Sequence, residues 1–104
     1  MPAIARAAGT DKVYSPDGVG KKCRFPTTTS TGAPTVTKVK IQGQFVVVEG
    51  DLVGVHNRTG CVPDTQTLST YSSKVFIGGK AVGRIGDNYG DNIITSGSTS
   101  VFAG

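Results

Sequence analysis

The chain has no tryptophan, a single histidine, one methionine and no long apolar segment. No run approaches the roughly 18 consecutive apolar residues that a membrane-spanning helix needs. Long runs of strong helix formers are also missing, whereas 15 glycines and many threonines and serines are present. Glycine and serine favour turns, and threonine favours strands. The composition therefore predicts an all-β fold.

Charge is also scarce, because charged residues make up 17% of the 104 residues, against about 25% in an average domain. The length predicts one domain over residues 1–104. The formal net charge of +4 comes partly from two clusters, 21–24 and 38–40. No aromatic residues alternate with these basic residues, so we expect a solvated surface and no nucleic-acid partner. A small basic β module that binds nucleic acid remains an alternative.

The N-terminal residues carry no secretory signal. The segment 1–9 has no charged region followed by an apolar one, so we expect a protein made in the cytoplasm without a signal peptide. Cys23 and Cys61 are the only cysteines. In a secreted protein they would suggest a disulfide. Without a signal, a reduced pair that is buried or bound to a metal is the expectation.

An internal repeat organises the chain. The segment Thr37–Asp51 (TKVKIQGQFVVVEGD) aligns without a gap with Ser73–Asp87 (SKVFIGGKAVGRIGD). Each copy predicts a β-hairpin, because an apolar strand is followed by a two-residue turn, Gln42-Gly43 or Gly78-Gly79. Asp51 and Asp87 follow glycine at the end of each copy, where aspartate commonly accepts hydrogen bonds from turn N–H groups.

A third copy is divided between the two ends of the chain. Residues 98–104 match the first half of the hairpin, and Pro2–Arg6 with Gly9–Asp11 match the second half. Pairing of the termini would close three hairpins into a ring of pseudo-threefold symmetry without a free edge strand. The connecting segments 12–36, 52–72 and 88–97 are expected to be irregular, except that the threonine-rich run 27–31 is expected to be extended.

The repeat resembles the PAAR-repeat family. The resemblance is carried by Pro2–Arg6, by Gly78–Asp87 (GGKAVGRIGD) and by Thr95–Gly104 (TSGSTSVFAG). It implies a small, cone-shaped all-β domain whose flat base caps the trimeric β-helix spike of a contractile injection machine, one copy per trimer. The implied role is structural: the tip sharpens the spike, touches the target cell envelope briefly and needs no small-molecule substrate. The implied location is the tail baseplate spike tip of a phage virion, or export through a type VI secretion apparatus.

The resemblance also implies one structural metal ion, typically zinc, near the vertex of the cone. The segment Val55–Pro63 resembles the family's histidine and cysteine loop, and the two cysteines occupy equivalent places in successive repeats. The expected ligands are His56, Cys61 and Cys23, since thiolates and imidazole suit Zn²⁺. A fourth ligand could be Asp91, Asp87 or a water, or it could be absent. A Cys23–Cys61 disulfide and two buried free thiols are the alternatives.

The apolar hairpin residues are the candidates for contact with the spike: Val39, Ile41, Val75, Ile77, Val101 and Phe102. Catalytic residues are not expected, because one histidine and no nucleophile motif give little basis for hydrolase chemistry. The sequence therefore predicts a protein that is not an enzyme. A small metal-dependent or carboxylate enzyme is kept as a competing hypothesis.

Overall fold

The computed structural model describes all residues 1–104 and consists of short strands and turns, with one 3-10 turn. The prediction of an all-β fold is confirmed. The elements are β1 (Lys12–Val19), η1 (Lys21–Cys23), β2 (Phe25–Ser30), β3 (Lys40–Ile41), β4 (Gln44–Phe45), β5 (Asn57–Arg58), β6 (Val62–Pro63), β7 (Phe76–Ile77), β8 (Lys80–Ala81), β9 (Asn88–Tyr89) and β10 (Asn92–Ile94).

The strands form one antiparallel sheet and three separate hairpins. The sheet has the order β2-β1-β10-β9, and the hairpins are β3–β4, β5–β6 and β7–β8. The longest pairing, β1 with β2, lies inside the segment 12–36, so the expectation of a mainly irregular connection there was wrong. The extended threonine run was predicted correctly, because β2 contains residues 25–30. Threonine is β-branched and suits a half-exposed sheet, which explains why so polar a segment forms a strand.

Both predicted hairpin turns have the backbone that their sequences favour. Gln42 and Gly43 have φ angles of 51° and 80°, and Gly78 and Gly79 have φ angles of 60° and 78°. Positive φ at both central residues matches the right-handed twist of the flanking strands. Gln42 is the one non-glycine among them, and its side chain accepts a hydrogen bond from Arg6 and donates one to Thr99.

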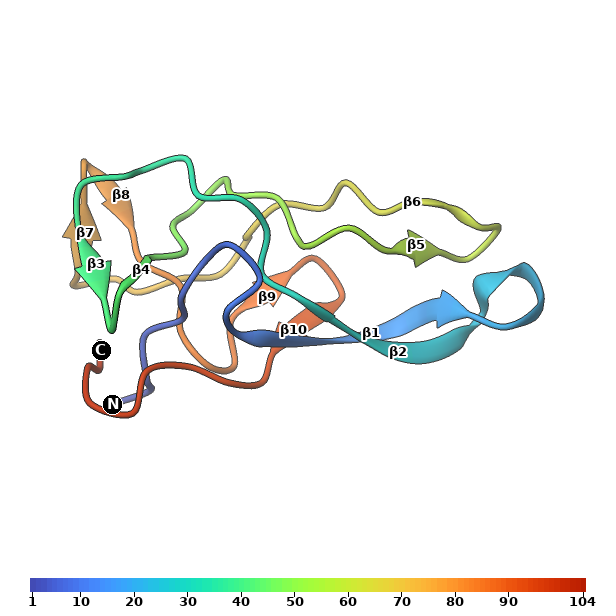
Figure 1. The fold of residues 1–104 in the computed structure, drawn as a ribbon, viewed down its shortest axis with the longest axis horizontal. Coiled ribbons are helices and arrows are strands. Elements are labelled where there is room, and N and C mark those ends of the chain that lie inside the picture. The colour runs from blue at the N-terminus through green and yellow to red at the C-terminus, as the bar shows by residue number, and fades with distance from the viewer.

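The chain ends pair with each other. Ala3 and Phe102 form an antiparallel bridge, the N–H of Ile4 donates to the carbonyl of Val101 at 2.9 Å, and Ala103 donates to Pro2 at 3.0 Å. Figure 1 shows both termini at one end of the molecule, beside β3–β4 and β7–β8. The two termini thus pair in an antiparallel manner, as β3 does with β4 and β7 with β8.

The segments that follow the hairpins close a cycle of backbone hydrogen bonds. Ala5 donates to Gly83 at 2.9 Å, Gly83 donates to Val47 at 2.8 Å, and Val47 donates to Ala5 at 3.1 Å. A second cycle surrounds the first: Ala7 donates to Phe45, Glu49 donates to Ala81, and Ile85 donates to Ala3. The three segments 3–7, 45–49 and 81–85 therefore hydrogen-bond to one another in a cyclic order.

Two apolar clusters pack on either side of this cycle. One lies under the hairpins and contains Ile4, Ile41, Val46, Val48, Val82 and Ala103. The other contains Ala5, Ala7, Val13, Val47, Val53, Leu68, Tyr89 and Ile94, and it joins the cycle to the four-stranded sheet. Burial of these side chains is the main stabilising contribution to so small a fold.

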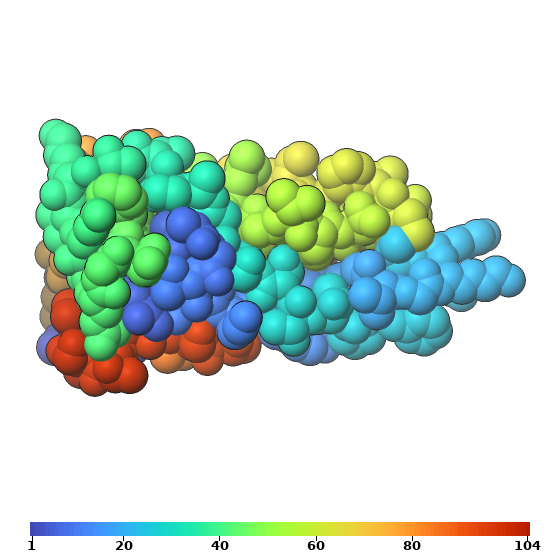
Figure 2. Space-filling model, viewed as in Figure 1, coloured from blue at the N-terminus to red at the C-terminus, as the bar shows by residue number.

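The molecule is elongated, with extents of 39 × 24 × 22 Å, and its two ends differ. The broad end, here called the base, comprises residues 1–3, 38–45, 74–81 and 99–104. The narrow end, here called the apex, comprises residues 17–25 and 57–63. Figure 2 shows the molecule tapering from the base to the apex, where the turn between β1 and β2 projects furthest.

Candidate functional site at the base and the apex

Three buried aspartates hold the centre of the molecule from equivalent positions. The carboxylates of Asp11, Asp51 and Asp87 accept backbone N–H groups from Arg6, Val48 and Arg84 respectively, at 2.6, 3.0 and 2.8 Å. Each also accepts a hydroxyl, from Ser96, Thr35 or Thr70. The structural role predicted for Asp51 and Asp87 is confirmed, and Asp11 has the same role.

Two of these aspartates also pair with arginine. Arg6 Nη2 lies 3.0 Å from Asp11, and Arg84 Nε lies 2.8 Å from Asp87. Burial acts to raise the pKa of Asp11, but hydrogen bonds from Arg6 and Ser96 and the charge of Arg6 outweigh it and hold that pKa below its usual value. The third position has no such partner, because Val48 stands where the other two segments have arginine.

The base exposes apolar side chains on a broad end of the molecule. Val39, Phe76 and Phe102 are 43%, 56% and 46% exposed. Val75, Ile77 and Val101 are half-buried against the cluster under the hairpins. Of the residues expected to contact a spike, only Ile41 is buried, at 9% exposure, so it supports the base from below. Phe76 was not among the residues expected to contact a spike. Side chains alternate along a strand, so Phe76 lies on the face opposite to that of Val75 and Ile77.

One hairpin of the base departs from the pattern of the others. Phe76 pairs with Ala81 and Phe102 with Ala3, whereas the equivalent pair in the first hairpin is Lys40 with Phe45. The Lys40 ammonium lies 5.0 Å from the centre of the Phe45 ring, within the range of a cation–π interaction. Each pair thus contributes one phenyl ring, but in the first hairpin the ring lies on the second strand.

The apex is closed by a covalent bond. Cys23 and Cys61 form a disulfide, with Cα atoms 5.1 Å apart. The bond joins the turn after β1 to the turn between β5 and β6, and the N–H of Gly60 also donates to the carbonyl of Lys22 at 2.7 Å. The repeat alignment correctly placed the two cysteines together. The expectation of a reduced pair was wrong, since the two sulfurs are bonded to each other in the structure.

His56 faces the inside of its own hairpin. Its Nδ1 lies 2.8 Å from the carbonyl oxygen of Gly54, and its Nε2 lies 3.0 Å from Asp64 Oδ2. The Nδ1 contact is a hydrogen bond, whereas Nε2 is buried without a hydrogen-bond partner and its contact with Asp64 is an ion pair only when the ring is protonated. Asp64 is buried, which acts to raise its pKa. Hydrogen bonds from Asn92 and Gln66 and the charge of His56 outweigh this and lower that pKa.

These contacts do not fit the zinc site that the resemblance implies. Both cysteine sulfurs are used in the disulfide, and both ring nitrogens of His56 face oxygen acceptors. Asp87 is committed to Arg84 and Asp91 to Gln66. No group of three or more His, Cys, Asp or Glu side chains is placed to hold a metal ion. The ligand set His56, Cys61 and Cys23 is therefore corrected to a Cys23–Cys61 disulfide and a separate His56–Asp64 pair.

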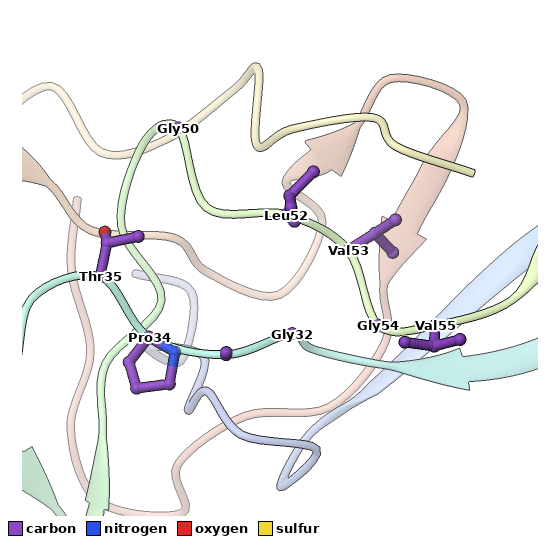
Figure 3. Close-up of a pocket in the computed structure, with 9 residues that line it drawn as sticks. Gly32, Pro34, Thr35, Gly50, Leu52, Val53, Gly54 and Val55 are labelled. Atoms are coloured by element: carbon purple, nitrogen blue, oxygen red, sulfur yellow. The ribbon is translucent and has the colours of Figure 1, made fainter. Parts of the chain in front are cut away.

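A pocket of about 360 Å³ lies between the base and the apex. Its walls are the segment 32–35, Gly50 and the segment 52–55, and Figure 3 shows Pro34, Leu52, Val53 and Val55 around it. The lining has no ionisable side chain. Its one hydroxyl, on Thr35, donates to Asp51.

No helix in the structure is long and apolar enough to cross a membrane. Comparison of the chain with protein-family models and with curated protein sequences gives no match.

Proposed function

We propose that this protein is a structural tip that caps a trimeric β-helix spike of a contractile injection machine, with a PAAR-type cone as its fold. In this proposal the base docks on the blunt end of the spike, one copy per trimer, and the apex points outward. The protein is then a stiff, shaped cap for the tail baseplate of a phage or for a type VI secretion spike, and it contributes no catalysis.

The observation that carries the proposal is the cyclic hydrogen bonding of Ala5, Gly83 and Val47. A single chain with three equivalent segments around one axis can meet a true threefold partner through three similar contacts, so one copy satisfies three spike chains. A chain without internal symmetry would leave two of every three equivalent surfaces on the trimer poorly matched.

The chemistry of the base supports the same partner. Exposed phenyl and isopropyl groups of Phe76, Phe102 and Val39 stand on a framework whose apolar cluster lies directly below. Aromatic side chains at the centre of an interface commonly provide much of the binding free energy. Four exposed lysines, Lys38, Lys40, Lys74 and Lys80, belong to the same end, which favours a spike with an acidic rim.

The test is coexpression with a trimeric β-helix spike protein of a contractile injection machine, followed by native mass spectrometry. We expect a complex of one copy with three spike chains. The variant Phe76→Asp should weaken that complex by about 10- to 100-fold, because it buries an unpaired carboxylate in the interface.

Phe25→Asp is the matched control. Phe25 is 56% exposed at the apex, the same fraction as Phe76 at the base, so the two variants change the same chemistry at opposite ends. Phe25→Asp should leave the complex intact. A folded spike trimer that never retains the wild-type protein would refute the proposed function. Equal loss from the two variants would refute docking through the base.

A further inference from the structure

The exposed charge at the apex is almost entirely positive. Lys21, Lys22, Arg24 and Arg58 are all exposed, and none of them belongs to an ion pair. Asp17 is the one acidic residue of the apex, so the four cations give a net charge of 4 − 1 = +3. In the body of the molecule Arg6 and Arg84 are neutralised by buried aspartates, whereas the base has four exposed lysines of its own, Lys38, Lys40, Lys74 and Lys80.

Apolar side chains stand among these cations. Val19, Phe25 and Val62 are 47%, 56% and 50% exposed. Val19 pairs with Phe25 across the end of the β1–β2 hairpin, and Val62 pairs with Arg58 in the β5–β6 hairpin. The Phe25 ring lies over Gly20, because a Cβ added there would be 2.4 Å from that ring. Cationic and apolar groups therefore share one projecting end.

Two features fix the two hairpin ends against each other. The disulfide joins Cys23 to Cys61, and Gly18 packs so closely on the β5 backbone that a Cβ added there would lie 3.2 Å from the carbonyl oxygen of Asn57. Arg58 of one hairpin is thereby held beside the lysines of the other, and these cations belong to one surface.

We propose that the apex is a docking surface for anionic lipid headgroups of a bilayer. The four cations would meet phosphate groups, and Val19, Phe25 and Val62 would enter the boundary between headgroups and acyl chains. The inference rests on the proposed function, because the spike would cover the lysines of the base. The apex would then be the one cationic end that is free to meet a bilayer.

The shape of the apex favours a lipid surface over a nucleic acid. The cations stand on a convex projection (Figure 2), whereas proteins that bind single strands provide a groove with aromatic platforms. Exposed valine side chains gain little from a phosphodiester backbone. At a bilayer interface, in contrast, apolar burial adds to the electrostatic attraction of basic residues.

The experiment is cosedimentation of the purified protein with vesicles of phosphatidylglycerol and phosphatidylcholine, compared with vesicles of phosphatidylcholine alone. Each basic residue near an anionic surface contributes about fivefold to binding. The variant Lys21→Gln/Lys22→Gln/Arg24→Gln should therefore bind anionic vesicles about 100-fold more weakly. Binding of the wild type should fall at high salt, because exposed charges are screened.

The matched control is Lys38→Gln/Lys74→Gln/Lys80→Gln, which removes three exposed lysines from the base. Its net charge is therefore the same as that of the apex triple variant. The control variant should bind anionic vesicles within about threefold of the wild type. Equal losses from both triple variants, no preference for anionic vesicles, or tighter binding to single- or double-stranded DNA than to the vesicles would each overturn the inference.

The two proposals fail in distinguishable ways. A spike complex without vesicle binding would overturn only the lipid-docking apex. Vesicle binding through the apex without any spike complex would overturn the proposed cap.

Discussion

The disulfide at the apex gives the sharpest prediction, because the sequence pointed to a metal at the same place. Cys23 and Cys61 are 38 residues apart in the chain. In the chain-entropy description, a cross-link that closes a loop of this size stabilises the folded state by about 4 kcal/mol. For a domain of this length, that corresponds to a decrease in Tm of roughly 20 °C when the bond is removed.

The perturbation is reduction of the bond, or the variant Cys23→Ala/Cys61→Ser. The variant should still fold, because both apolar clusters and the central hydrogen-bond cycle lie outside the apex. Urea unfolding followed by circular dichroism would measure the loss of free energy of unfolding. The untreated protein should also have an intact mass two hydrogen atoms below that of the reduced protein.

A strong chelator without reductant is the control that separates the disulfide from a metal site. We expect no change in Tm with the chelator and a large decrease with the reductant. A large decrease in Tm with the chelator and none with the reductant would refute the disulfide. Two thiolates that hold a metal resist mild reductant, and the protein then loses stability when the metal is removed. The disulfide would also be refuted if the untreated and reduced proteins had the same mass.

Three further predictions concern the body of the molecule. Asp87→Ala should lower the free energy of unfolding by about 2–3 kcal/mol, because it leaves the N–H and guanidinium of Arg84 without their acceptor. Asp17→Ala, which removes a carboxylate without a hydrogen bond, should change it by less than about 0.5 kcal/mol in the same urea titration. Stability should fall with acid, because the pKa values of Asp11 and Asp64 are lowered in the folded state. Their contribution is complete above the unfolded pKa of about 4 and is lost as pH falls through the lower folded values, so a Tm that is constant from pH 7 to strongly acidic pH would contradict the assignment. Gly54→Ala should cost about 1–3 kcal/mol, because the new Cβ would lie 2.2 Å from the carbonyl oxygen of Ser30; a Tm equal to that of the wild type would show that these two segments separate more easily than the close packing indicates.

Some features were decided by local sequence, and the reason is that they depend on neighbouring residues only. The all-β class follows from composition, and the positive-φ turns at Gln42-Gly43 and Gly78-Gly79 follow from two-residue patterns. The capping role of Asp51 and Asp87 follows from their place after glycine. The pairing of the termini is a long-range contact, but the alignment of residues 98–104 and 2–6 with the internal repeat predicted it.

Other features depend on contacts between segments that are distant in the chain, and only the tertiary structure decided them. The β1–β2 hairpin pairs across a turn without a standard signal, in which Lys22 and Cys23 both have positive φ. His56 was expected to meet the cysteines, but the fold turns its ring toward Gly54 and Asp64. The cluster under the hairpins packs against one face of each strand only. Ile41 lies on that face and is buried, whereas Phe76 and Phe102 lie on the other face and are exposed.

The cysteines show the division most clearly. The sequence determined that Cys23 and Cys61 occupy equivalent places in successive repeats and would meet at one end of the molecule. The tertiary structure decided that the two turns approach closely enough for the sulfurs to bond, through the packing of Gly18 on Asn57 and the hydrogen bond from Gly60 to Lys22. That approach is a property of the packed molecule, because no residue pattern near either cysteine specifies the distance between the two turns.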